Sequence, residues 1–282
     1  MEAPDVVSVA KGHPRYLTRR TGIRYLEMAV GAILFLILLQ LALGYDVLDG
    51  GFWSRFAGTY ARGFIGTLTY TAVVIPVSVV IGFFGGWARV TRHRVLSWPV
   101  AVFVDFFRGI PPLVLVIFAY LFGPDFLPQQ LYSRGMALTI AALAIAFHSA
   151  AYQVEIFRAG FQSIPRGQME AAEALGMSRW QTMRHVILPQ TFRLSLPPLG
   201  NEFATVIKDT SLIGIVGASE MVALGQEFNQ QVLISGTGPL VWIFAVWTII
   251  ALTYFAITFL VTRLLLGLEH RYHTPGLEAI SL

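Results

Sequence analysis

The sequence contains no cysteine, and only two of its 282 residues are lysine. The lack of cysteine excludes disulfides, thiolate metal sites and cysteine nucleophiles. Charged residues are scarce as well: they make up 13% of the chain, whereas a soluble domain carries roughly a quarter. With 55% hydrophobic residues and a mean hydropathy of +0.64, there is too little polar material to cover a soluble surface. The composition predicts a polytopic membrane protein.

Six segments are apolar and long enough to cross a bilayer as helices, which takes about 20 residues each. They are residues 25–44, 63–88, about 98–122, about 135–157, about 194–218 and 240–262. Glycines 82, 85 and 86 near the end of the second segment are small enough to let helices approach closely. We therefore expect an all-α fold with about six transmembrane helices.

The basic residues predict the orientation through the positive-inside rule. Placing the N-terminus in the cytoplasm leaves only Arg55, Arg62 and Arg134 outside. A cleaved signal peptide ending near residues 42–44 would also fit the start of the chain, but the apolar run is long enough for an uncleaved anchor. We expect both termini in the cytoplasm, together with fifteen basic residues: Lys11, Arg15, Arg19, Arg20, Arg24, Arg89, Arg92, Arg94, Arg158, Arg166, Arg179, Arg184, Arg193, Arg263 and Arg271.

The long connection at about residues 159–193 is rich in helix signals. Residues 168–175 are strong helix formers, and Gly176 interrupts them. Ser178 is a suitable N-cap for a second short helix, 179–187, that stops before Pro189. The pattern predicts two short helices hinged at a glycine, with one apolar face formed by Met169, Ala172 and Leu175. An amphipathic helix lying on the membrane surface is the alternative.

In this connection the chain resembles the EAA loop of ABC importer permeases. Glu170-Ala171-Ala172, Gly176 and Val186-Ile187-Leu188-Pro189 follow the pattern EAA, three residues, G, nine residues and I-x-L-P, with valine in place of the first isoleucine. Other segments resemble the polar amino-acid branch of these permeases (histidine, glutamine and glutamate type). They are Gly66-Thr67-Leu68, Phe107-Arg108-Gly109-Ile110-Pro111, Ala151-Tyr152 with Glu155-Ile156 and Arg158, Gly167-Gln168, Leu199-Gly200-Asn201 and Lys208-Asp209-Thr210-Ser211-Leu212.

The resemblance covers about residues 63–267 and implies a type I importer permease core, with residues 25–62 as an added first helix and external loop. Residues 1–24 and 268–282 would be cytoplasmic tails. The resemblance also implies a bacterial inner-membrane transport subunit that is not an enzyme and needs no cofactor. Its expected partners are a cytoplasmic ATP-binding subunit, a second permease subunit (itself or a related chain), an extracytoplasmic solute-binding protein and the lipid bilayer.

The resemblance assigns the coupling to the ATPase to a set of small, acidic and turn-forming residues in the loop. Two alanines permit close docking, Glu170 can form a charge-assisted bond with a partner cation, and Gly176 permits a sharp turn. The resemblance implies a polar amino acid, or another small amino-acid-like solute, as the cargo. It does not imply which one, because Leu115 stands where the family often has glutamine, and Pro112 adds a second proline. The coupling residues are Gly167, Gln168, Glu170, Ala171, Ala172, Gly176, Leu188 and Pro189.

Ionisable residues within spans are costly and usually functional. A helix broken at prolines often marks a substrate site in transporters, and Arg108 precedes such a break. An amino acid presents a carboxylate and an ammonium group, which Arg108 and either Glu155 or Glu202 would match. The alternative is that these charges pair with one another, as Asp105 and Arg108 would at i and i+3. The candidate pathway residues are Arg108, Gly109, Pro111, His148, Tyr152, Glu155, Asn201, Glu202, Lys208 and Asp209.

Other chemistry has little support in the sequence. There is no phosphate-binding Gly-x-x-x-x-Gly-Lys-Ser/Thr loop and no Gly-x-Ser-x-Gly elbow. The pair His270 and His273 has no accompanying carboxylate, so we expect no metal site. The basic clusters follow the topology, so we expect no nucleic acid partner. A transporter that works alone, or an intramembrane enzyme, would leave the EAA loop unexplained.

Overall fold

The computed structural model describes residues 49–272 apart from 92 and 237, together with parts of 30–44. In this part of the chain every regular element is a helix, and no strand is found. Residues 1–24, the expected N-terminal tail, and residues 273–282 of the expected C-terminal tail (268–282) lie outside the described residues, as does part of the expected first span at 25–44. Residues 268–272 belong to the last helix. The all-α prediction is confirmed.

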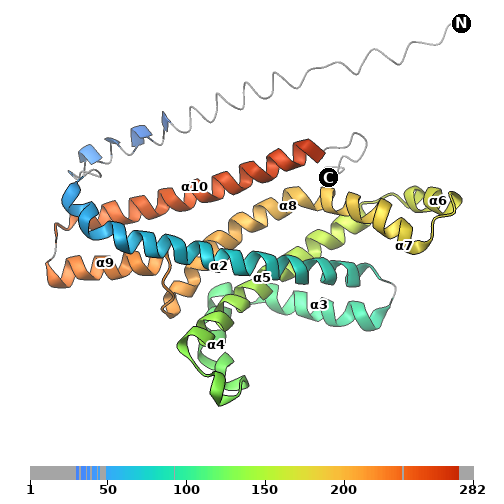
Figure 1. Cartoon of the computed structure of the whole chain (residues 1–282), viewed down its shortest axis with the longest axis horizontal. Coiled ribbons are helices and arrows are strands. Elements are labelled where there is room, and N and C mark those ends of the chain that lie inside the picture. The colour runs from blue at the N-terminus through green and yellow to red at the C-terminus, as the bar shows by residue number, and fades with distance from the viewer. Residues whose placement is uncertain are drawn as a thin grey trace, which may run out of the picture.

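Three described helices are long and apolar enough to cross a membrane: α2 (Gly50–Val90), α5 (Arg134–Gln162) and α10 (Val241–Tyr272). The helices α2 and α10 extend along the long axis of the molecule (Figure 1). The bent pair α3 (Arg94–Gly109) and α4 (Pro112–Phe122) adds a fourth crossing if it counts as one span. The chain is thus a multi-pass membrane protein, while the number six stays a prediction.

The expected span at about 98–122 is broken in the middle, because the chain turns by 103° between α3 and α4. Ile110 and Pro111 are extended at this point, with ψ angles of 134° each. Proline supplies no backbone N–H and pushes the preceding residue away from helical geometry, so two successive prolines end one helix and begin another. Short 3₁₀ turns at Gly123–Phe126 and Gln129–Leu131 then lead to α5.

The expected span at 194–218 is also displaced. Helix α8 runs from Leu188 to Asp209 and continues as a 3₁₀ turn, Thr210–Val216, which ends at Gly217 in a left-handed conformation (φ 91°). A further helix, α9 (Met221–Ser235), follows where the sequence predicts none. Its N-cap is Glu220, a fully buried carboxylate that accepts hydrogen bonds from the backbone N–H groups of Val222 and Ala223 and from the Tyr254 hydroxyl of α10.

Helix α2 begins at Gly50, well before the expected residue 63, so the external loop expected before residue 63 is in part helical. The Asp49 carboxylate explains this start, since it caps the Gly51 N–H at 2.8 Å and accepts from the Trp242 indole at 3.1 Å. At 1.5 Å per residue the helix is about 60 Å long, twice the roughly 30 Å hydrocarbon core. The helix is therefore longer than one crossing requires, and α9 packs against its first turns through Phe228, which contacts Phe52 and Phe56.

Small residues on one face of α2 bring it close to α5. The buried positions Gly63, Thr67, Ser78, Gly82 and Gly86 recur about every four residues, which places them on one side of the helix. A Cβ atom at Gly86 would lie 2.6 Å from the Phe157 Cβ, so α5 occupies the space that a side chain would need. The predicted packing role of the glycines is confirmed, and α2 with α5 forms the most extensive helix pair in the described chain.

Gly82→Ala tests this contact. A Cβ at this position would lie 2.5 Å from the Gln153 Cβ and 3.2 Å from the Gln153 carbonyl carbon, so the two helices must separate. We expect the free energy of unfolding to fall by about 1–3 kcal/mol, as in other overpacked cores, measured by denaturant unfolding in detergent. Gly58→Ala is the control, since nothing lies within 4 Å of its Cβ position. Equal unfolding midpoints in the two variants would contradict the contact.

Candidate functional site

The loop between α5 and α8 folds as two short helices, as predicted, at the end of the molecule opposite α9 (Figure 1). Helix α6 spans Arg166–Ala174 and α7 spans Arg179–Thr182. Gly176 joins them with a φ of 76°, a left-handed conformation that favours glycine. Ser178 begins α7 with a reciprocal capping box in which the Gln181 side chain also takes part. The predicted hinge and N-cap are both confirmed.

The sequence predicts that the second short helix stops before Pro189, but in the structure the helical path continues through this residue. A π-helical turn, Met183–Ile187, connects α7 directly to α8. Within it the Leu188 N–H donates to the Met183 carbonyl five residues earlier. Because Pro189 has no N–H, it can make no backbone hydrogen bond to the preceding turn. The wider π turn tolerates this missing bond, so the helical path continues into α8. Leu188 is half-buried and Pro189 is exposed.

The predicted apolar face of the loop is not buried against the rest of the chain. Ala172 is only 3% exposed, but Met169 is 46% exposed and Leu175 is 81% exposed. Trp180 on α7 adds a further large apolar surface at 62% exposure. Five of the predicted coupling residues are polar or small and are also exposed: Gly167, Gln168, Glu170, Ala171 and Gly176. The loop therefore offers a mixed apolar and acidic surface without a described partner.

A pocket of about 560 Å³ lies where α3, α5 and α8 meet. It brings together four of the candidate pathway residues: Arg108, Tyr152, Glu155 and Glu202. Its wall is completed by Ile156, Ala159, Gly160, Ser163, Leu194, Pro197 and Pro198. The Arg108 guanidinium lies over the Tyr152 ring, 4.9 Å from its centre. The site thus combines a cation, an aromatic face and two carboxylates.

A chain of buried hydrogen bonds fixes the Glu202 side of the pocket. The Ser149 hydroxyl donates to the Glu202 carboxylate at 2.7 Å. The Gln153 amide donates to Ser149 at 3.0 Å and to Ser78 of α2 at 2.8 Å. The sequence analysis missed Ser78, Ser149 and Gln153. One signal in the sequence could have indicated them. Ser149 and Gln153 are polar residues within a span, and their spacing of four residues places them on one face of the helix.

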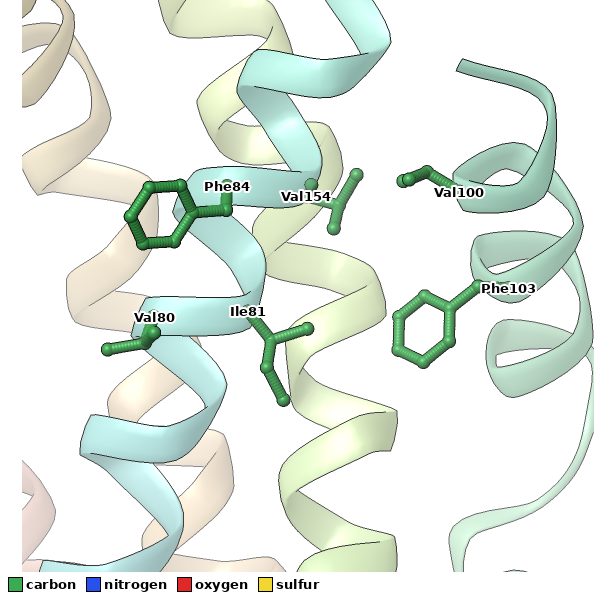
Figure 2. Close-up of a pocket in the computed structure, with 7 residues that line it drawn as sticks. Val80, Ile81, Phe84, Val100, Phe103 and Val154 are labelled. Carbon is green, nitrogen blue, oxygen red and sulfur yellow. The ribbon is translucent and has the colours of Figure 1, made fainter. Parts of the chain in front are cut away.

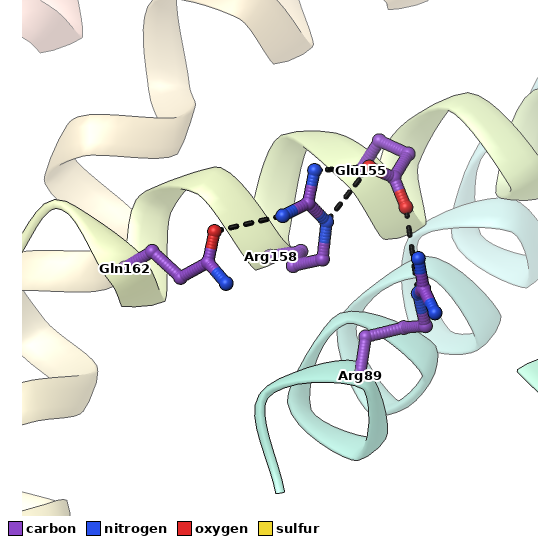
Figure 3. A network of polar contacts seen from close by, with 4 residues as sticks. All are labelled: Arg89, Glu155, Arg158 and Gln162. Atoms are coloured by element: carbon purple, nitrogen blue, oxygen red, sulfur yellow. Dashed lines mark hydrogen bonds and ion pairs between the residues drawn. The ribbon is translucent and has the colours of Figure 1, made fainter. Parts of the chain in front are cut away.

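Glu155 is the centre of an ion-pair network at the end of α2 and α5 (Figure 3). Its carboxylate pairs with Arg158 one helical turn later at 2.5 Å and with Arg89 of α2 at 3.6 Å. Arg158 also donates to the Gln162 amide oxygen at 2.7 Å. One carboxylate therefore links α2 and α5 while it also lines the pocket.

The remaining candidate residues are placed differently. The alternative, an Asp105–Arg108 ion pair, does not form, because the Arg108 guanidinium lies over the Tyr152 ring instead. His148 is buried and donates its Nδ1–H to the Phe107 carbonyl of α3 at 2.8 Å. Arg108 and Gly109 end α3 just before the break, and Pro111 lies within it. Asn201 and Lys208 share an exposed face of α8 outside the pocket lining, and Asp209 is half-buried at the end of α8.

A second pocket, of about 410 Å³, lies between α2, α3 and α5 (Figure 2). Its lining is entirely apolar: Val80, Ile81, Phe84, Gly85, Val100, Phe103 and Val154. Val100 and Phe103 point from α3 toward α2 (Figure 2). Since no polar group is available there to orient a charged solute, this pocket does not compete with the first as a site for a polar ligand.

Known proteins resemble the chain over most of its length. The family described as a binding-protein-dependent transport system inner membrane component matches residues 78–273. The glutamine transport system permease protein GlnP of Escherichia coli (strain K12) is 36% identical over 205 residues, or 73% of this chain and 89% of GlnP. The L-cystine transport system permease protein TcyB of Bacillus subtilis (strain 168) is 32% identical over 236 residues, or 83% of this chain and 94% of TcyB.

Among solved structures, an amino acid ABC transporter with histidines has a chain that superposes with a TM-score of 0.67 and 27% identity. The superposition covers 80% of this chain and 99% of that chain. The likeness therefore includes nearly the whole of that solved chain, and the fold predicted from the sequence motifs is confirmed.

Single cysteines test whether the pocket between α3, α5 and α8 is open to water, because the chain has none of its own. Ala159→Cys, on the pocket wall, should react rapidly with a hydrophilic thiol reagent. Ala151→Cys, on the same helix but fully buried, should react slowly and is the matched control. Labelling is measured by mass spectrometry of the folded protein. Equally slow labelling of both would show that water does not fill the pocket.

Proposed function

The chain belongs to the family of binding-protein-dependent transport system inner membrane components, and from this premise we propose that it is the permease subunit of an ATP-driven importer for a polar amino acid. As a permease of this family it is a transport subunit, and ATP hydrolysis belongs to a separate subunit. The observation that carries the choice of solute is the pocket in which Arg108, Glu155 and Glu202 meet. Another small solute of amino-acid-like charge is the alternative.

The pocket suits a zwitterion for electrostatic reasons. The Arg108 guanidinium can bind the α-carboxylate through two parallel hydrogen bonds, and Glu202 can accept from the ammonium group. Glu155 already has Arg158 and Arg89 as partners, so Glu202, which receives a single bond from the neutral Ser149 hydroxyl, is the better ammonium ligand. The pocket volume of about 560 Å³ lies within the usual range of about 300–1,000 Å³ for small-molecule sites.

The loop formed by α6 and α7 is the proposed docking surface for the ATPase subunit. Exposed Met169, Leu175 and Trp180 offer apolar anchors, and the exposed Glu170 offers a carboxylate for a partner cation. The distribution of the basic residues supports a cytoplasmic position for this loop and for both termini in the inner membrane. An extracytoplasmic solute-binding protein would then deliver the solute at the opposite face, where α9 lies.

A second permease subunit is supported by the polar face of α8. Asn201, Thr205 and Lys208 lie on one side of this helix and are exposed in the single chain. Polar side chains of membrane helices face a partner helix or a water-filled cavity rather than lipid. A second copy or a related chain packed against this face would shield these side chains from lipid, either by direct contact or by enclosing a water-filled cavity.

The ATPase contact is tested by Glu170→Lys in the reconstituted transporter, assayed for ATP hydrolysis with a panel of polar and apolar amino acids. We expect hydrolysis stimulated by a polar amino acid in the wild type, and loss of both stimulation and ATPase co-purification in the variant, because the charge reversal repels the partner cation. Glu227→Lys, an equal charge reversal on exposed α9, should co-purify normally. Wild-type behaviour of Glu170→Lys would contradict the docking surface.

Arg108→Ala and Glu202→Gln test the solute contacts in the same assay. Each should raise the amino-acid concentration that gives half-maximal stimulation about tenfold or more, since a hydrogen bond to a charged group contributes about 1.5–3 kcal/mol. Asp105→Asn removes a neighbouring exposed charge that does not line the pocket and should change little. An unchanged half-maximal concentration in both pathway variants would rule out the proposed contacts.

A further inference from the structure

A third pocket lies at the turn between α2 and α3, away from the proposed solute pathway. It has a volume of about 630 Å³ and is lined by Arg89, Arg94, Val95, Ser97, Trp98 and Ala101. Arg89 lies in the last turn of α2, and Arg94 is the first residue of α3. Since α2 crosses the membrane and the chain reverses here, the pocket lies at the level where the bilayer meets water.

The pocket has the charge and polarity that a phosphate group requires. Arg94 is exposed and takes part in no ion pair among the described residues. Arg89 also lines the pocket. Its buried Nε atom faces the Glu155 carboxylate at 3.6 Å, too far for a hydrogen bond. The Ser97 hydroxyl adds a neutral donor. Two guanidinium groups and a hydroxyl on one wall form a set of donors for an anion.

The same pocket also has an apolar rim. Trp98 is 70% exposed and Val95 is 85% exposed. Tryptophan is enriched at the membrane–water interface because its ring is apolar and its N–H is polar. A free phosphate ion would gain nothing from such a rim, whereas the glycerol and acyl carbons of a phospholipid would cover it. Basic pockets between membrane helices are known to bind anionic lipid headgroups.

We propose that this pocket binds the headgroup of an anionic phospholipid, with the phosphodiester between Arg89 and Arg94 and the glycerol region against Trp98. The lipid site depends only on the membrane-spanning fold and the residues of the pocket. Charge complementarity identifies the occupant, since a zwitterionic lipid would bring its own cation toward two arginines.

The site has a direct connection to the pathway pocket through Arg89. This side chain lines the proposed headgroup site and also approaches Glu155, which lines the pathway pocket (Figure 3). A phosphodiester near Arg89 competes with Glu155 for the guanidinium and weakens the 3.6 Å contact between α2 and α5. The lipid thereby changes the charge on the pathway wall. This second part of the proposal rests on the proposed function.

Lipid binding is tested with the full-length transporter reconstituted in nanodiscs that contain phosphatidylcholine and phosphatidylglycerol. The phosphatidylglycerol retained after detergent extraction is counted by native mass spectrometry. We expect Arg94→Gln to lower retention about fivefold, the factor for one arginine at an anionic surface. Arg62→Gln, which removes an equal charge from exposed α2 outside the pocket, should retain as much lipid as the wild type.

Three outcomes would overturn the lipid site. The first is equal retention in Arg94→Gln and the wild type. The second is displacement of phosphatidylglycerol by inorganic phosphate, which would indicate a site for soluble anions. The third is unchanged lipid retention with loss of ATPase co-purification in Arg94→Gln, which would assign the pocket to a protein contact. These readouts do not depend on which solute is transported, so failure of the proposed function is seen separately.

The link to transport is tested by comparing uptake in pure phosphatidylcholine with uptake in the mixed lipid. We expect phosphatidylglycerol to change the uptake rate of the wild type and of Arg62→Gln but not that of Arg94→Gln. If Arg94→Gln loses the lipid and its uptake still responds to phosphatidylglycerol, the connection through Arg89 and Glu155 is wrong. An absence of uptake in every lipid would instead contradict the proposed function.

Discussion

The close contact between α2 and α5 is the constraint on which the other features depend. Glycines at positions 82 and 86 let the two backbones approach, and α5 fills the space that side chains would occupy. At this distance Ser78 of α2 reaches the Gln153 amide, which through Ser149 fixes the Glu202 carboxylate of α8. The Arg89–Glu155 contact at the end of the same pair completes the arrangement. The wall of the pocket between α3, α5 and α8 is therefore positioned by the packing of α2 against α5 together with this ion pair.

Local rules predicted those features that depend on a few neighbouring residues. The helix break at Pro111 and Pro112, the left-handed glycine at 176 and the Ser178 cap all follow from backbone chemistry within a single turn. Long apolar runs likewise predicted where α5 and α10 begin to within one residue, whereas both helices end later than expected, at Gln162 and Tyr272. The candidate residues Arg108, Tyr152, Glu155 and Glu202 were each selected because charged or polar groups in a span are costly.

Features that depend on distant residues could not be predicted in this way. The early start of α2 needs Trp242 as well as Asp49, and α9 is anchored by a bond from Glu220 to Tyr254 of α10. The Asp105–Arg108 pair failed because Arg108 found an aromatic partner from α5. Spacing along one helix does not show which side chain a neighbouring helix presents, so the pairing of the charges required the structure.

The π turn joins α7, which carries part of the proposed docking surface, to α8 in one continuous helical path. Helix α8 has 22 residues and is about 33 Å long. As a lever pivoted at the π turn, it converts a swing of about 10° into a displacement of about 6 Å at the far end, by simple geometry on that length. Glu202, Lys208 and Asp209 lie toward that far end. A flexible linker would not pass a movement of α7 on to α8. An unbroken helical path transmits this movement to the part of the chain that carries the charges.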